Sequence, residues 1–423
     1  MKTHLQIKIL LSALILFFGV GKPLMAQTNW VKHEGNPILT GQADSWYEDI
    51  AVAVVIHEEN TFKMWFSASE QAWSASKGHS IGYAESDDGL EWEVREDPVI
   101  PVGPDGSWYR SKWPGTVLRI NDTLKMWYGA SADAFNYHFS MGYAWSVDEH
   151  FWNIDTVPLL GPGEPGSWDD SGNHHPKVHF DGTTYHMWFN GFTGGAFGPD
   201  QIGYATSTDG IHWEKDTLHN PVFPIQPSTF YSTWVWTGSV LVQDGEYQMW
   251  FRAYDGQLIR FGYATSTDGI NWEPGNDNQP VLTSGPELWE NWDIFFPSVL
   301  WHDGQYKMWY TGQCYGCDFK LGYATSDSSG VFIENYLTRE FKYEVSPNPF
   351  TTSATLSYTL ERPENIRFTV YNVQSQIVFE MQEMQGKGEQ QLQWNAKGLP
   401  AGMYYFRMQA GEMAGSGKMI KLE

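Results

Sequence analysis

Two acidic residues and a pair of histidines lie near the same point of a pattern that this chain repeats. Asp49 and Asp293 occupy one equivalent position in two repeats, and His174 and His175 lie close to that position in a third. Carboxylate and imidazole groups are common proton donors and acceptors in general acid–base catalysis. The alternative is that the aspartates cap turns and the histidines pack, which requires no ligand. The elements that position these side chains therefore have to be identified from the repeat.

Two short motifs recur five times and define that repeat. A Met-Trp dipeptide appears at intervals of 62, 61, 62 and 59 residues, beginning at Met64, Met126, Met187, Met249 and Met308. A Gly-Tyr-Ala tripeptide follows each copy, beginning at Gly82, Gly142, Gly203, Gly262 and Gly322. Self-similarity at a fixed period is the signature of a fold built from stacked repeats.

Each repeat has the pattern of four short antiparallel strands. A β-rich segment comes first, and a polar turn, which contains Asp-Gly at 181–182 and 303–304, joins it to the Met-Trp strand. A variable loop, the Gly-Tyr-Ala strand, a second turn and a short strand with a tryptophan complete the unit. Helical periodicity over a useful length is absent. The five units predict an all-β chain with a five-bladed β-propeller at 27–335.

The N-terminal strand is expected to close this ring. Residues 29–39 resemble the tail of a repeat, with Trp30 and an Asn-Pro pair, whereas the fifth repeat lacks such a tail after Ser326. The first strand of the mature chain would therefore complete the last unit and leave no exposed sheet edge.

Three further segments flank the ring. Residues 1–26 combine a positive start with an apolar stretch too short to span a bilayer, which predicts a secretory signal peptide. No membrane span is predicted for the mature protein. Residues 336–344 form a charged linker. The short alternating strands of 345–423 predict a small Ig-like β-sandwich.

Charge and cysteine content restrict the partners. The formal net charge is −24, and residues 345–423 carry equal numbers of acids and bases, so the acidic excess lies in the predicted ring. This field repels phosphate backbones, which excludes nucleic acid and favours a neutral ligand. Cys314 and Cys317 are the only cysteines, too few for a zinc site with four ligands, so we favour a local disulfide. We predict a monomer without a metal or cofactor.

The C-terminal segment resembles the type A sorting domain of the type IX secretion system of Bacteroidetes-type bacteria. The resemblance rests on Ser-Pro-Asn-Pro-Phe at 346–350, Leu-Pro-Ala-Gly-Met-Tyr-Tyr-Phe at 399–406 and Gly-Lys-Met-Ile-Lys at 417–421. It implies transport across the outer membrane to the cell surface or the medium, with the secretion machinery as a partner.

The ring resembles the five-bladed propeller glycosidases of the arabinanase, xylosidase and β-fructosidase kind. The resemblance rests on the residues at 297–312, which include Asp-Gly-Gln-Tyr-Lys-Met-Trp-Tyr-Thr-Gly, and on Ile-Gly-Tyr-Ala-Thr-Ser-Thr-Asp-Gly-Ile-His-Trp at 202–213. These motifs are structural, so they are specific for the blades and not for catalysis. The resemblance implies a glycan ligand at one mouth of the central channel.

The same resemblance implies three catalytic carboxylates, of which one is missing. Asp49 matches the base from the first blade, and Asp169 or Asp170 matches the aspartate that tunes the acid. The entry to the fourth blade, 230–238, contains no carboxylate where the general acid is expected. Asp293, Glu290 or His174 would have to replace it.

Several other side chains are expected at the mouth. Tryptophans that the repeat does not require are candidate platforms for a sugar ring: Trp113, Trp234, Trp236 and Trp292. Lys112, His175 and Arg252 are the candidate polar contacts. Two interpretations stay open: a glycoside hydrolase acting on a neutral polysaccharide or oligosaccharide, and a propeller for glycan binding or surface adhesion that does not cut.

Overall fold

The structure is a computed structural model that describes residues 29–70, 77–132, 139–194, 198–243, 245–314, 316–326, 343–360, 362–372, 377–410 and 413–422. The predicted signal peptide and most of the predicted linker lie outside these residues. The described chain is almost entirely strand, with two 3₁₀ helices, η1 (Asn276–Asn278) and η2 (Leu288–Glu290), which confirms the all-β class. In this part of the chain, neither helix has the length and hydrophobicity needed to cross a membrane.

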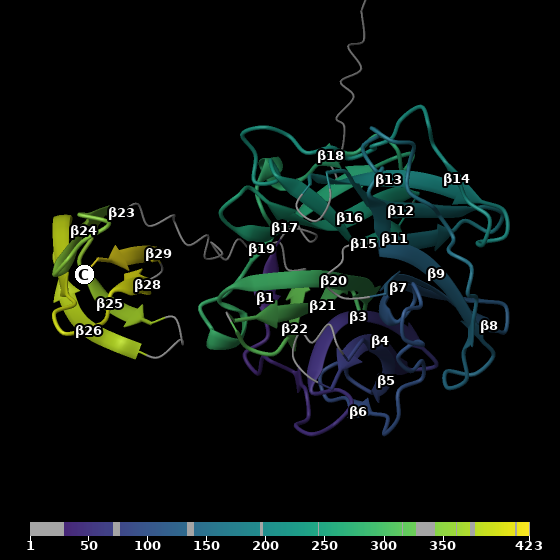
Figure 1. Cartoon of the computed structure of the whole chain (residues 1–423), viewed down its shortest axis with the longest axis horizontal. Helices are drawn as coiled ribbons and strands as arrows, with labels where there is room; N and C mark the ends of the chain where they lie inside the picture. Colours follow the sequence, from purple (N-terminus) through teal and green to yellow (C-terminus); the bar gives the residue numbers. More distant parts are fainter. Residues whose placement is uncertain are drawn as a thin grey trace, which may run out of the picture.

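Residues 30–326 form five antiparallel sheets arranged around a common centre (Figure 1). The first contains β3 (Asp49–Glu58), β4 (Thr61–Ser69), β5 (Ser80–Ser86) and β6 (Glu93–Val94). The second contains β7 (Ser111–Ile120), β8 (Thr123–Ser131), β9 (Phe139–Ser146) and β10 (Asn153–Ile154). The third contains β11 (Gly172–Phe180), β12 (Tyr185–Phe192), β13 (Asp200–Ser207) and β14 (Glu214–Lys215). The fourth contains β15 (Trp234–Gln243), β16 (Glu246–Tyr254), β17 (Ile259–Ser266), β18 (Glu273–Pro274) and β19 (Leu282–Thr283).

The fifth sheet is completed by N-terminal residues. It contains β20 (Asp293–His302), β21 (Gln305–Gln313), β22 (Lys320–Ser326), β1 (Trp30–Lys32) and β2 (Leu39–Thr40). β1 pairs with β22, with Trp30 opposite Ser326. The side-chain amide of Asn36 bonds both backbone groups of Tyr323, as Asn220 does for the equivalent tyrosine of the third sheet. The predicted pairing of the first strand with the last repeat is confirmed.

The first strands of the five sheets contact one another in circular order. β3 contacts β7, β7 contacts β11, β11 contacts β15, β15 contacts β20, and β20 contacts β3. Hydroxyls on one strand accept backbone N–H groups from the next: Thr116 from Val178, Ser239 from Val299, and Ser298 from Val55. Each of these strands also has a shift in its ladder register near the middle. Such bulges bend a strand and turn side chains out of the ladder.

The tryptophans of the Met-Trp motif join neighbouring sheets through what we call the indole latch. In the described part of the chain, three of the five indoles donate their N–H to the carbonyl of a glycine in the next sheet: Trp127 to Gly210, Trp188 to Gly269, and Trp309 to Gly89, at 2.7–2.8 Å. The third of these joins the fifth sheet to the first. The indole of Trp65 has no partner among the described residues, and the second repeat carries Glu149 where the first, third and fourth repeats carry Gly89, Gly210 and Gly269.

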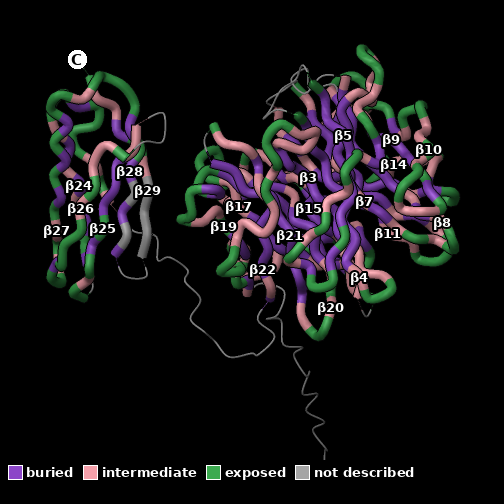
Figure 2. Tube along the Cα trace, turned by 90° about the horizontal axis from the view of Figure 1, so that it is seen from below, coloured by how far each residue is buried: buried purple, intermediate pink, exposed green. Residues whose placement is uncertain are grey.

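The C-terminal residues form two sheets that share one core. The first contains β23 (Tyr343–Ser346), β24 (Ser353–Leu360) and β27 (Gly388–Asn395). The second contains β26 (Ile377–Gln385), β25 (Glu364–Tyr371), β28 (Gly402–Ala410) and β29 (Met413–Lys421). Leu356 and Trp394 of the first sheet are buried in one cluster with Phe368 and Phe406 of the second. Buried and exposed positions alternate along several of these strands (Figure 2).

Cys314 and Cys317 form a disulfide in the loop that follows β21. It closes a short loop, and the backbone N–H of Cys317 also bonds the carbonyl of Cys314. The predicted local disulfide is confirmed.

The indole latch can be tested with two matched glycine variants. Gly89 and Gly304 both have a positive φ, 80° and 78°. A Cβ on Gly89 would lie 2.8 Å from Cζ2 of Trp309, whereas a Cβ on Gly304 would meet nothing within 4 Å. Both alanine variants strain the backbone, but only Gly89→Ala pushes against the buried indole. We expect Gly89→Ala to lose about 1–3 kcal/mol more unfolding free energy than Gly304→Ala in urea denaturation. Equal losses would show that the indole contact contributes nothing.

Candidate functional site

The starts of the five first strands meet at one end of the ring, which we call the mouth. Because equivalent residues of neighbouring strands bond each other, as Val178 bonds Thr116, these strands run side by side in one direction. Asp49 and Asp293 begin β3 and β20 and pair with the last residues of the second strands of their sheets. The loops after those second strands therefore share the mouth.

A continuous line of side chains lies at this end, which we call the mouth cluster: Trp113, Phe139, His174, Trp236, Arg252, Phe295 and Phe319. The ring centroids of Trp113 and Phe139 are 5.8 Å apart, and those of Phe139 and His174 are 5.1 Å apart. His174 lies 5.5 Å from Trp236. The structure thus brings four of the predicted mouth residues, Trp113, His174, Trp236 and Arg252, into one line of contacts.

Arg252 and Asp293 form a buried ion pair at the centre of this line. Nη2 of Arg252 donates to Oδ2 of Asp293 at 2.5 Å, and its Nε donates to the carbonyl of Ile294 at 2.9 Å. The guanidinium carbon lies 4.7 Å from the ring of Trp236 and 3.9 Å from that of Phe295. Arginine is held flat between aromatic faces in this way by cation–π attraction.

Burial changes the protonation of Asp293. Desolvation raises the pKa of its carboxyl to about 6, although the adjacent Arg252 opposes the shift. Burial also lowers the pKa of Arg252, against the attraction of Asp293. Oδ1 of Asp293 has no hydrogen-bond partner among the described residues. A carboxyl with a raised pKa and an unengaged oxygen has the properties of a proton donor.

Asp49 is also buried and is fixed by the backbone. Its Oδ1 accepts the N–H of Phe319 at 2.7 Å. The ring of Phe319 lies 5.1 Å from that of Phe295, so Asp49 is joined to the end of the mouth cluster. The two aspartates predicted at equivalent positions therefore flank the same aromatic group.

His174 faces a carboxylate that the sequence reasoning did not identify. Its Nε2 lies 3.6 Å from Oδ2 of Asp200, and the same oxygen accepts the indole N–H of Trp236. Nδ1 of His174 is buried and has no hydrogen-bond partner in the described chain. Asp200, His174 and Trp236 thus form a polar group within the aromatic line.

His175 follows His174 at the bulge of β11. Its φ is 53°, and Phe296 at the equivalent bulge of β20 has a φ of 47°. The two rings are 4.7 Å apart, and both contact Trp236. Burial, followed by the nearby His174, lowers the pKa of His175 well below its usual value, which leaves its imidazole neutral at physiological pH. Positive φ at bulky residues is costly, and such strain tends to occur at functional sites.

Two predicted residues are engaged elsewhere. Asp170 accepts the backbone N–H of Gly166 and the hydroxyl of Ser171, so it caps a turn, and hydrogen bonds lower its pKa. Nζ of Lys112 donates to the carbonyl of Tyr109 at 3.0 Å, and burial lowers the pKa of this amine to about 8. The structure does not join either side chain to the mouth cluster.

The remaining predicted tryptophans differ in their surroundings. Trp234 stacks on Trp236 with ring centroids 5.1 Å apart, so it extends the aromatic group. Trp292 is 51% exposed and immediately precedes β20.

The mouth residues that the sequence did not predict come from a second position of the repeat at which the residue type varies. Three residues before each Gly-Tyr-Ala lie His79, Phe139, Asp200, Ile259 and Phe319. Four of these, His79, Phe139, Asp200 and Phe319, contact the predicted mouth residues. Aligning the repeats on Met-Trp alone does not bring these residues to one position, whereas aligning them on Gly-Tyr-Ala does. The residue type at this position varies although the rest of the repeat is regular, and that variation could have indicated a functional position.

No metal centre is found within the described ranges, where no three His, Cys, Asp or Glu side chains are grouped so that they could hold an ion.

The C-terminal residues match a family model described as a secretion system C-terminal sorting domain, over residues 344–422. The chain is therefore exported by the type IX secretion system, typical of Bacteroidetes, to the cell surface or the extracellular space.

The ring is similar to proteins of known sequence and structure. Two uncharacterised proteins from strains of Mycobacterium tuberculosis are each 29% identical over 268 residues, which cover 61% of this chain and 86% of theirs. A putative glycosidase from Bacteroides thetaiotaomicron has a TM-score of 0.57 at 17% identity, over 70% of this chain and 97% of its own. A β-1,2-mannobiose phosphorylase from Listeria innocua, solved with β-1,2-mannobiose, has a TM-score of 0.56 at 14% identity, over 71% and 97%. The chain shares the fold of glycoside hydrolase-like propeller proteins.

The protonation of Asp293 predicts a pH effect on stability. Because its pKa is raised to about 6 in the folded protein, the folded state binds more protons than the unfolded state between about pH 4 and pH 6. The free energy of unfolding therefore falls as the pH rises through this window. Relative to Asp293→Asn, the wild type should lose on the order of 3 kcal/mol between about pH 4 and pH 7, measured by urea denaturation. Asp122→Asn, in an exposed turn, is the control. Parallel profiles for wild type and Asp293→Asn would contradict the shift.

Proposed function

We propose that this chain is an exported protein that binds a neutral glycan at the mouth and hydrolyses its glycosidic bonds. In this proposal residues 27–335 form a single five-bladed β-propeller, 336–344 a linker and 345–423 an Ig-like β-sandwich that directs export. The circular contacts of the five first strands and the match to a sorting domain support this division.

The observation that carries the proposal is the composition of the mouth cluster. Sugar rings present flat C–H faces that pack on aromatic side chains, and their hydroxyls need polar partners. The mouth holds the part-exposed indoles of Trp234 and Trp236 and the buried indole of Trp113 beside buried carboxylates. We assign substrate binding to these tryptophans, with Trp292 at the edge and with Arg252 and His175 below them. The repeat does not require an indole at these positions, since Ala51 stands in the place of Trp113 and Trp236 in the first repeat, and Ser111 and Gly172 stand in the place of Trp234 in the second and third.

Hydrolysis needs one carboxyl that donates a proton to the leaving oxygen and one that stays ionised. We assign the donor role to Asp293, because its pKa is raised and its Oδ1 is unengaged among the described residues. Asp49, held by the N–H of Phe319, takes the role of the base. The pair Asp200 and His174 supplies further polar contacts to the substrate.

The substrate is proposed to be uncharged because the chain carries a net charge of −24. A β-1,2-linked mannoside is the first substrate to test, because two proteins of similar fold point to that linkage. One is the β-1,2-mannobiose phosphorylase, and the other comes from a family of mannoside phosphorylases that contains glycoside hydrolases targeting β-1,2 mannosidic linkages in Candida mannan. We propose that the protein acts as a monomer.

A second candidate function is glycan binding without cleavage. Three predicted carboxylates are already engaged by the protein: Asp49 and Asp170 by backbone N–H groups, and Asp293 by Arg252. The start of β15 presents Trp234 and Trp236 where the resemblance implies an acid. These contacts favour a surface that holds a sugar chain.

The test is a screen of the full chain against mannan, β-1,2-oligomannosides, arabinan, xylan and laminarin, scoring both binding and released sugar. We expect sugar release, and a fall in rate of at least about 100-fold in Asp49→Asn and in Asp293→Asn. Trp236→Ala should instead weaken binding about tenfold, because it removes a stacking face.

Asp122→Asn controls for the loss of an exposed carboxylate and should behave as wild type. Binding without sugar release would support the second candidate. Full activity in Asp49→Asn would remove that residue from the mechanism and leave Asp200, beside the donor Asp293, as the remaining candidate for the base.

A further inference from the structure

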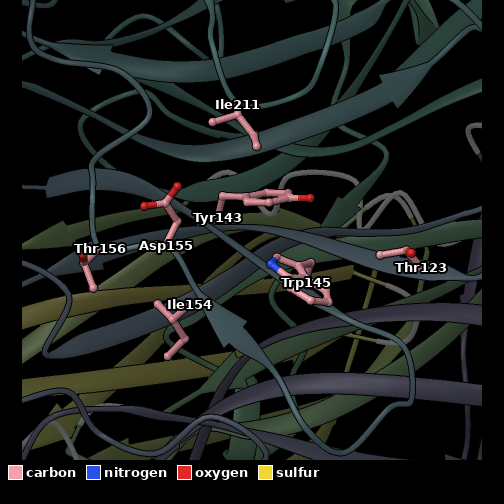
Figure 3. A pocket seen from close by; sticks show the side chains of 7 residues that line it. All are labelled: Thr123, Tyr143, Trp145, Ile154, Asp155, Thr156 and Ile211. Atoms are coloured by element: carbon pink, nitrogen blue, oxygen red, sulfur yellow. The ribbon is translucent and has the colours of Figure 1, made fainter.

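A hollow with a volume of about 510 Å³ lies between the second and third sheets, away from the mouth. Its walls come from the outer strands β9 and β10 and the first residue of β8, and Ile211 closes it from the third sheet. In Figure 3 the ring of Tyr143 lies between Asp155 and Trp145. Thr123 begins β8, whereas the mouth lies at the other end of that strand, roughly 25 Å away.

The repeat does not require the tryptophan in this hollow. Trp145 follows Gly-Tyr-Ala, where the other four repeats carry Glu85, Thr206, Thr265 and Thr325. Its side chain is 41% exposed, so it does not fill the core as the Met-Trp tryptophans do. An indole that replaces a short polar residue and remains in contact with solvent adds little to packing and exposes a flat apolar face.

The tyrosine beside it also differs from its counterparts. In the first sheet the hydroxyl of Tyr83 donates to Glu85 at 2.5 Å, and in the third sheet that of Tyr204 bonds His186 at 2.5 Å. The hydroxyl of Tyr143 has no such partner among the described residues. Trp145 occupies the position of Glu85, so the second sheet lacks the carboxylate that accepts the tyrosine hydroxyl in the first sheet.

Further hydrogen-bonding groups surround the indole. Within the described ranges, the hydroxyls of Thr123 and Thr156 bond no other protein group, although both line the hollow. Asp155 contributes a carboxylate, of which Oδ1 is occupied by the N–H of Val157. No basic side chain lines the space. The hollow therefore combines one stacking face with three hydroxyls and an acceptor, and it disfavours an anionic ligand.

We propose that this hollow is a second glycan-binding site, which takes a neutral sugar unit stacked on Trp145 and hydrogen-bonded by Thr123, Tyr143, Asp155 and Thr156. It goes beyond the function proposed for the mouth, since it requires no bond cleavage. Because the hollow is far from the mouth, it can hold one part of a polysaccharide while another part of the same polysaccharide lies at the mouth.

The test uses the full chain in native gels that contain mannan, arabinan, xylan or laminarin. Wild type should be retarded by at least one of these polysaccharides. Trp145→Thr, which installs the residue that three other repeats carry, should raise the dissociation constant from that polysaccharide about tenfold. Trp301→Ala is the matched control, because its indole is 43% exposed at the other end of β20 and lines neither site.

The outcomes separate the two sites. Retardation of Trp145→Thr equal to wild type, or no retardation of wild type in any gel, overturns the proposal. Loss in Trp301→Ala as large as in Trp145→Thr also overturns it, since exposed tryptophans in general would then be responsible. If wild type binds through Trp145 but releases no sugar, cleavage at the mouth fails while the second site stands. Thermal melting of both variants confirms that they are folded.

Discussion

Three of the contacts between neighbouring sheets of the ring depend on a hydrogen bond from a buried indole to a turn carbonyl of the next sheet. The Met-Trp tryptophans are fully buried, so an unpaired indole N–H would cost about 1–3 kcal/mol, and glycine lets the turn present its carbonyl at close range. The same bond joins the fifth sheet to the first. These latches lie in the body of the sheets and not at the strand starts. The residues at the strand starts therefore need not hold neighbouring sheets together, and they can differ from sheet to sheet.

The mouth contains a buried ion pair made of residues that differ from sheet to sheet. Arg252 and Asp293 are both buried, and an ion pair removed from water is tolerated only when its partners are close and further bonds satisfy them. The carbonyl of Ile294 and the faces of Trp236 and Phe295 supply those contacts. A charge pair of this kind is weak evidence for stability, since apolar residues of similar size would serve as well. The chemistry proposed for the mouth would account for its presence.

The repeat allowed the strands, their order and the completing role of the first strand to be predicted, because each follows from local periodicity and from Trp30 and Asn36 matching later tails. It also identified the strand starts as the variable part, and Trp113, His174 and Trp236 do lie in one line. Asp200 could not be placed, since its contact with His174 depends on how far one strand is staggered against its neighbour. The capping role of Asp170 was equally hidden, because it rests on the path of a single loop.

The bond between Asn36 and Tyr323 spans 287 residues of chain, so the part of the ring that is synthesised first is needed last. Until β1 docks, β22 presents a row of unpaired backbone groups at the edge of an otherwise finished sheet. Closure is therefore the step with the greatest sequence separation and is slow for topological reasons. A β1 strand from another molecule would meet the same edge with the same register. At high protein concentration, exchange of β1 between chains therefore competes with closure within one chain during refolding, and dilution favours closure.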